Sequence, residues 1–126
     1  MRVARTTTLA LTLALLGILA TGCPKQGGPV EGQELVGEWA DTGSAIYTLA
    51  IVNRQLRLMS VVDNDGEVFE VRKSGWAGGH FTIDYHVPST GYDVTITLIE
   101  QVREGVWMTY WVNAYDNGNE EWTKVD

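Results

Sequence analysis

The chain has 126 residues, with 16 Asp and Glu against nine Lys and Arg, and it contains a single cysteine. The acidic balance argues against nucleic acid as a partner and against direct binding to anionic lipid headgroups, because both attract clusters of Lys and Arg. One cysteine excludes an internal disulfide, and the length suits one domain.

The first 23 residues have the layout of a secretory signal peptide. Arg2 and Arg5 precede an apolar run from Leu9 to Ala20, and small residues follow up to Cys23. This run of 12 residues is too short for a membrane-spanning helix, which needs about 20 apolar residues. The pattern therefore predicts a segment that is cleaved after export.

The four residues Ala20-Thr21-Gly22-Cys23 resemble the lipobox of bacterial lipoproteins. The resemblance implies that residues 1–22 are removed and that the sulfur of Cys23 receives a diacylglyceryl group. An ordinary cleaved signal beside an incidental cysteine is the alternative. Two or more acyl chains would anchor the protein firmly, since each buried methylene contributes about 0.8 kcal/mol.

The lipoprotein resemblance also implies a place in the bacterial cell envelope. Pro24 stands where an Asp would indicate retention in the inner membrane, which favours the outer membrane, facing the periplasm. Without residues 1–22 the chain would keep seven basic and 16 acidic residues, a net charge of −9. We expect residues 23–34 to be a lipidated cysteine and a flexible tether, and residues 35–126 to form the folded domain.

From Leu35 onward, period-2 alternation and turn residues predict eight short strands and no helix longer than a turn. The expected strands are 35–40, 44–52, 55–63, 67–74, 79–87, 92–100, 105–115 and 119–125. The gaps between them are of hairpin size. We therefore expect an all-β fold, a small eight-stranded antiparallel meander barrel, with a two-sheet β-sandwich as the alternative.

The hairpin of strands 79–87 and 92–100 has a well-defined register. Placing Val87 opposite Tyr92 brings each inward apolar residue against another, including Tyr85 opposite Val94. A slip by one residue would turn the whole set outward.

The last hairpin is predicted from a two-residue turn at Asn117 and Gly118, which would place Trp111 beside Lys124. Three tryptophans would then share one face: Trp107, Trp111 and Trp122. We expect this face either to pack in the core or to form an aromatic patch that meets a partner or the membrane interface.

The first predicted strand carries Gly37-Glu38-Trp39, which resembles the Gly-x-Trp signature of lipocalins and related calycins. In that family the tryptophan closes one end of a β-barrel, commonly against a basic residue of the last strand, for which Lys124 is the candidate here. The resemblance implies a barrel and, as one function, binding of a small apolar or amphipathic ligand.

No pattern of catalytic or metal-binding residues emerges. His80 and His86 lie about 20 Å apart on one strand face, too far to share a metal, and His86 opposite Asp93 is explained as an exposed pair. The run from Asp63 to Glu67 lacks two ligands of a calcium loop and predicts a type I turn with a glycine bulge. We therefore expect no enzyme activity, no metal and no cofactor.

Aromatic residues are the remaining candidates for a binding site. They lie at a glycine-rich tip, at inward strand positions and in the last hairpin: Trp76, Tyr85, Tyr92, Trp107, Trp111 and Trp122. We expect a non-enzymatic envelope lipoprotein that acts as a protein-interaction or inhibitor-type module. Binding of a small apolar or amphipathic ligand is the alternative.

Overall fold

The computed structural model describes residues 29–125 of the chain. One turn of 3₁₀-helix, η1 (Gln33–Leu35), precedes eight strands. These are β1 (Gly37–Ala40), β2 (Ile46–Val52), β3 (Gln55–Val62), β4 (Glu70–Ala77), β5 (His80–Val87), β6 (Tyr92–Arg103), β7 (Val106–Val112) and β8 (Asn117–Val125). The predicted signal peptide and Cys23 lie outside the described residues.

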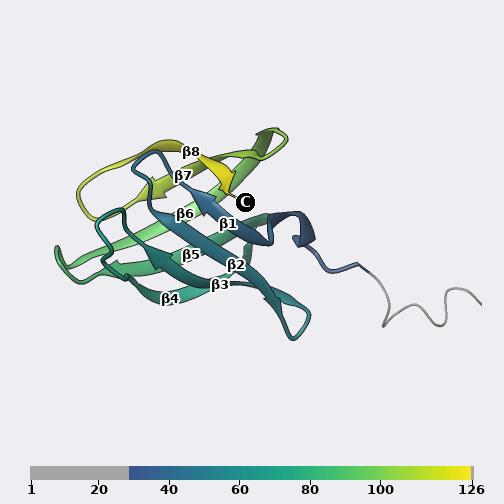
Figure 1. Cartoon of the computed structure of the whole chain (residues 1–126), viewed down its shortest axis with the longest axis horizontal. Helices are drawn as coiled ribbons and strands as arrows, with labels where there is room; N and C mark the ends of the chain where they lie inside the picture. Colours follow the sequence, from purple (N-terminus) through teal and green to yellow (C-terminus); the bar gives the residue numbers. More distant parts are fainter. Residues whose placement is uncertain (1–28, 126) are drawn as a thin grey trace, which may run out of the picture.

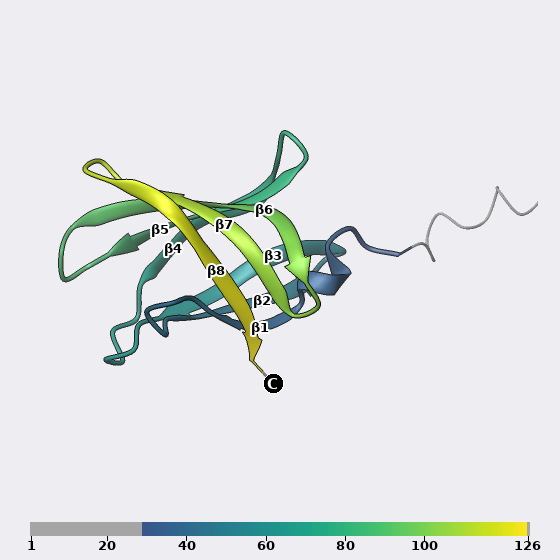
Figure 2. The ribbon, with the colours of Figure 1, turned by 90° about the horizontal axis from the view of Figure 1, so that it is seen from above.

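The strands form a single antiparallel sheet in which chain neighbours pair, except that β3 does not pair with β4 and β1 pairs with β8. The sheet curls into a nearly closed barrel, and the C-terminus lies beside β1 (Figures 1 and 2). Between β3 and β4 there is no continuous ladder of backbone hydrogen bonds, and we call this gap the seam. It is spanned by a bridge between Val62 and Val68 and by a 3.1 Å hydrogen bond from the Leu58 N–H to Ser74 Oγ. The predicted meander barrel is confirmed, and the described strands do not divide into two sheets.

The register predicted for the hairpin of β5 and β6 is confirmed. Val87 lies opposite Tyr92, Tyr85 opposite Val94, and the remaining pairs follow without a shift. Strict alternation on both strands explains the success, because only one register buries the apolar face.

The turn predicted at Asn117 and Gly118 is wrong. Both residues belong to β8, and Trp111 pairs with Gly118 instead of Lys124. Gly118 serves packing here, since a Cβ at this position would come within 3.2 Å of the Trp111 indole. The connection is made by residues 113–116.

The loop at 113–116 supplies its own hydrogen bonds. The side-chain oxygen of Asn113 accepts the N–H groups of Tyr115 (2.7 Å) and Asp116 (2.9 Å). This side-chain pattern mimics a backbone turn and makes a longer loop competitive with the Asn-Gly turn.

Aromatic side chains fill the barrel. Tyr47 stacks on Trp122 with ring centroids 4.3 Å apart, and Phe69 stacks on Tyr85 at 5.3 Å. Trp39 and Trp122 are the largest fully buried side chains. Burying a large apolar side chain contributes about 1.5–3 kcal/mol, so these rings supply much of the stability that a disulfide-free domain needs.

Candidate functional site

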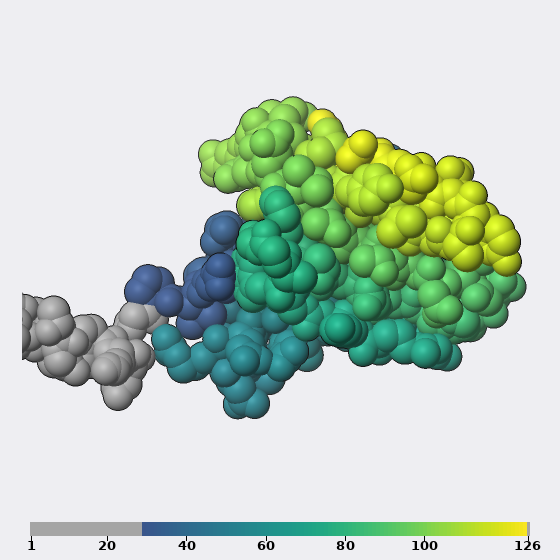
Figure 3. Space-filling model, turned by 180° about the vertical axis from the view of Figure 1, so that it is seen from behind, coloured from purple at the N-terminus to yellow at the C-terminus, as the bar shows by residue number. Residues whose placement is uncertain are grey.

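The meander places alternate connections at opposite ends of the barrel. The end at which the described chain begins is called the tether end and consists of residues 29–36 and the hairpin tips 53–54, 78–79 and 104–105. The opposite end is called the distal end and consists of the loops 41–45, 63–69, 88–91 and 113–116. Figure 3 shows the chain, in dark blue, reaching the barrel among the tips of the tether end.

The tether end is closed by residues 30–36, which we call the plug. Leu35 is buried, and its carbonyl oxygen accepts the Trp39 Nε1–H at 2.9 Å. Lys124 Nζ donates to the Val36 carbonyl oxygen at 2.9 Å and lies 5.0 Å from the centroid of the Trp39 ring. The contact between Trp39 and a basic residue of the last strand, which the Gly-x-Trp resemblance implied, is therefore present.

Gly32 fixes the plug by its lack of a side chain. Its φ of 87° is left-handed, and a Cβ would lie 2.8 Å from Leu56 Cδ2 and 2.9 Å from Trp76 Cζ2. The chain thus passes between side chains of β3 and β4 at a position where any Cβ would force Leu56 or Trp76 to move. Of residues 30–34, which composition placed in the tether, Gly32 is buried here, whereas Glu31, Gln33 and Glu34 are exposed.

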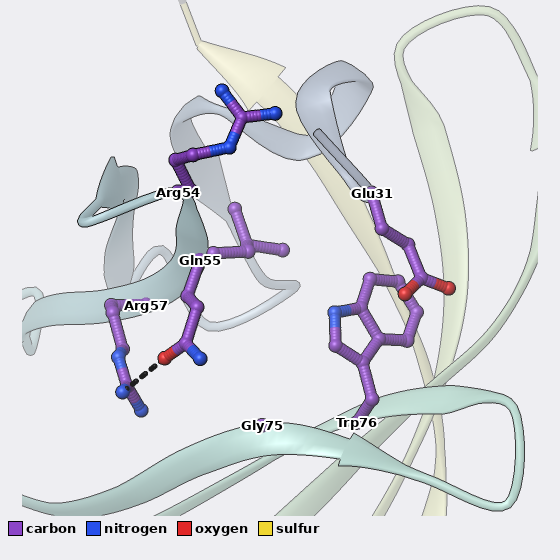
Figure 4. Close-up of a pocket in the computed structure, with 7 residues that line it drawn as sticks. Glu31, Arg54, Gln55, Arg57, Gly75 and Trp76 are labelled. Atoms are coloured by element: carbon purple, nitrogen blue, oxygen red, sulfur yellow. Dashed lines mark hydrogen bonds between the residues drawn. The ribbon is translucent and has the colours of Figure 1, made fainter. Parts of the chain in front are cut away.

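A hollow of about 290 Å³ opens beside the plug where β3 and β4 diverge. Gln55 and Arg57 line its β3 side, with Trp76 and Glu31 across from them (Figure 4). The Arg57 guanidinium donates to the Ser74 carbonyl oxygen at 3.3 Å and so spans the seam. Side-chain hydrogen bonds therefore connect β3 and β4 here, where the two strands form no ladder of backbone hydrogen bonds.

Two further hollows, of about 300 and 280 Å³, continue around the plug. Trp76 lines the first and second hollows, and Trp107 lines the second and third. Trp76 is 39% exposed and packs edge-on against Phe81, with centroids 5.4 Å apart. Each hollow lies close to the lower size limit of small-molecule sites, about 300 Å³, and is open to solvent.

The three tryptophans of the last hairpin share one face, as predicted, and this face points inward. Trp107 pairs with Trp122, which is fully buried, while Trp107 and Trp111 are partly buried against the core. Tyr85 is also buried. Of the six predicted aromatic candidates, only Trp76 and Tyr92 count among the exposed residues.

A network of hydroxyl and carboxylate groups lies at the distal end. The Tyr47 hydroxyl donates to Asp41 Oδ2 at 2.8 Å and lies 3.3 Å from the Tyr85 hydroxyl, and the Thr42 hydroxyl donates to Glu120. Burial raises the pKa of Tyr85 to about 12 and raises the pKa of Tyr47 further. Partial burial, with a contribution from the Asp41 charge, raises the pKa of Glu120.

The distal end also exposes two aromatic rings. Tyr92 and Tyr115 lie with ring centroids 5.3 Å apart, and Tyr115 is 77% exposed. The four distal loops contain five acidic residues and no Lys or Arg. The acids are Asp41, Asp63, Asp65, Glu67 and Asp116.

The predicted His86–Asp93 pair is present, with 2.8 Å between Nδ1 and Oδ1. Asp84, the other acid near this histidine, instead accepts the Thr95 hydroxyl at 2.7 Å. The pair is solvent-accessible, and such pairs contribute under about 1 kcal/mol.

The turn predicted for residues 63–67 is also found. Gly66 has a φ of 93°, and its N–H donates to the Asp63 carbonyl oxygen at 2.9 Å. The carboxylates of Asp63, Asp65 and Glu67 lie within 4.8 Å of one another. Those of Asp65 and Glu67 accept hydrogen bonds from this turn and from Ser89, so turn formation accounts for the cluster.

The structure defines a class of protein: a small antiparallel β-barrel with a plugged end and an interior filled by aromatic side chains. No protein-family model, curated protein or solved structure compared with the chain matches it. Within residues 29–125, no helix is long and apolar enough to cross a membrane.

Proposed function

We propose that this protein is a lipoprotein of the bacterial cell envelope whose barrel is a non-enzymatic module that binds another protein. The signal-peptide pattern and the position of Cys23 support the lipid anchor. The filled interior is the observation that favours an outer surface as the binding site. Tyr47 and Trp122 occupy the space that an enclosed ligand would need in a barrel of this size.

The distal end is the surface best suited to a partner. It faces away from the tether, and it exposes Tyr92 and Tyr115, a residue type enriched at protein interfaces. Its acidic loops suit a partner with a basic surface, because complementary charge accelerates association and excludes acidic competitors.

The anchor is tested by replacing the cysteine. We expect Cys23→Ser to move the protein from the membrane fraction to the soluble fraction, because the acyl chains supply the attachment. Pro24→Ser is the matched control, since it changes the neighbouring residue and keeps the thiol. A Cys23→Ser protein that stays with membranes after a high-salt wash would contradict the anchor.

The interaction is tested by cross-linking in intact cells and identifying the captured proteins by mass spectrometry. Removing both distal rings, Tyr92→Ala with Tyr115→Ala, should lower capture of a specific partner about tenfold or more, as expected for aromatic hot spots. Met59→Ala is the control, because Met59 is half exposed on the barrel wall. Equal capture by both variants would exclude the distal end.

A second candidate is binding of a small apolar ligand in the hollow of about 300 Å³ beside the plug. Its lining by Phe81, Leu98 and Trp107 favours this function. Mass spectrometry of organic extracts of the purified protein would detect such a ligand. Its loss in Trp76→Ala, together with its retention in Met59→Ala, would assign it to this hollow.

A further inference from the structure

We propose that the tether end of the barrel rests on the bilayer surface, so that the barrel stands upright with its distal loops pointing away from the membrane. This orientation presupposes the lipid anchor on Cys23 proposed above. It adds a lipid contact made by the barrel itself.

The exposed apolar residues at the tether end are arranged as membrane-interface anchors. Val52, Trp76 and Val102 are exposed, and each stands within two residues of a hairpin tip. Ile99 adds an exposed apolar side chain beside the hollow of about 300 Å³. Tryptophan in particular favours the headgroup region, where its ring is apolar and its N–H remains hydrated.

Charge is distributed unevenly between the two ends. Four of the six Lys and Arg within residues 29–125 lie at or beside the tether end: Arg54, Arg57, Arg103 and Lys124. Six acids accompany them: Glu31, Glu34, Glu38, Glu100, Glu104 and Glu121, the last of which lies 3.9 Å from Arg103. The tether end thus has a net charge of −2, against −5 for the distal loops, which contain no Lys or Arg.

The uneven charge selects one orientation at an anionic lipid surface. Anionic headgroups attract Lys and Arg and repel carboxylates within about 10 Å, the screening length at moderate salt. The distal loops are therefore repelled more strongly than the tether end, where Arg54 and Arg103 lie at or beside hairpin tips. The net negative charge of the whole chain does not oppose this seating, because most of the excess lies away from the tether end.

The length of the tether is compatible with direct contact. Pro29 follows Cys23 by six residues, which span at most about 20–22 Å when extended. The plug holds the chain after Pro29 against the end of the barrel. A longer tether would require the plug to detach, which would lose the packing of Leu35 and Gly32. The eight residues of β5 have a strand length of about 26 Å, which holds the distal loops clear of the bilayer even with the strand tilt of a barrel.

The orientation is tested on the full lipidated protein in vesicles of phosphatidylcholine and phosphatidylglycerol that carry a headgroup quencher. Ala77, beside a tether-end tip, and Ala114, in a distal loop, are both exposed and form a matched pair. With the native thiol acylated, Ala77→Cys and Ala114→Cys each offer one site for an environment-sensitive fluorophore. We expect several-fold stronger quenching at position 77.

Two outcomes would overturn the orientation and are distinguishable. Equal or reversed quenching of vesicle-bound protein contradicts the seating alone and leaves the anchor intact. Absence of the protein from the vesicles contradicts the anchor and the seating together. Intrinsic fluorescence gives a second reading without labels: Trp76→Phe should lower the fraction of tryptophan emission quenched by brominated lipid, and Trp111→Phe should not.

Discussion

At the tether end the barrel is closed by packing and by hydrogen bonds to backbone carbonyl oxygens, whereas at the distal end hydroxyl groups donate to carboxylates. Gly32 fits between Leu56 and Trp76 because it has no side chain and can adopt a left-handed backbone. By contrast, Tyr47 and Thr42 donate hydroxyl hydrogens to acidic side chains. We therefore expect substitutions that create cavities or clashes at the tether end to destabilise the fold. Changes in protonation should instead alter stability through the distal end.

The largest effect is expected from Trp39→Ala. This change removes a buried ring, its hydrogen bond to Leu35 and its contact with Lys124, and we expect a loss of about 3–5 kcal/mol in the free energy of unfolding. Trp111→Ala is the distal counterpart, and its ring is only partly buried, so its loss should be smaller. Denaturant unfolding followed by circular dichroism measures both, and equal losses would remove the contrast between the ends.

Alkaline pH should act on the distal end. The folded protein keeps the Tyr85 proton up to a pKa of about 12, whereas the unfolded chain loses it near 10. The contribution of Tyr85 to stability is therefore constant below pH 10 and falls as the pH rises toward 12, by on the order of 2 kcal/mol. Tyr85→Phe should make the fall less steep in unfolding experiments across this range. An unchanged slope would refute the assignment to Tyr85.

Gly32→Ala isolates the steric fit of the plug. We expect a loss of about 1–3 kcal/mol, because the left-handed backbone and the clash with Leu56 and Trp76 act together. Gly66→Ala is the matched distal control: its φ is 93°, yet nothing lies within 4 Å of the added Cβ. A smaller loss for Gly66→Ala, with faster amide exchange at Leu35 only in Gly32→Ala, would confirm the packing role. Equal losses would show that backbone strain alone matters.

The smallest effect is expected from Glu120→Gln. The pKa of Glu120 is raised in the folded protein, so the ionised form is disfavoured at pH 7, and stability from this group rises as the pH falls through the raised pKa. The glutamine side chain stays neutral and still accepts the Thr42 hydroxyl. We expect a gain under about 1 kcal/mol at pH 7, with a weaker dependence on pH. A loss of stability in thermal melts at pH 7 would contradict this.

The barrel could be predicted because most strands alternate strictly, but the last hairpin shows where alternation fails. Both faces of β7 are largely apolar, so a slip of six residues, an even number, leaves Trp107, Trp111 and Trp122 on the same face. The alternation pattern therefore determines which face the three tryptophans share, but it does not determine the register of β7 against β8. The Asn113 side chain decided it by hydrogen bonding the longer loop.

The details of the two ends could not be read from local patterns. Thr42 and Glu120 are 78 residues apart, and neither strand pattern pairs them. The plug depends on the shape of the gap at Gly32, and a segment rich in Gly, Gln and Glu resembles a linker by composition. The contact of Trp39 with Lys124 was the exception, because a family resemblance supplied the long-range pairing.

Pairing of β1 with β8 also limits when the barrel can close during folding. Glu38 pairs with Val125, so the two ends of the domain must meet before the barrel closes. Such long-range pairing is slow, because the entropy of closing the loop is lost before the contacts form. Local hairpins such as β5–β6 can form first, while β1 keeps an unpaired edge on its β8 side. A chain synthesised from its N-terminus therefore exposes that edge to proteases and to other chains until its last three strand residues, Thr123 to Val125, are available.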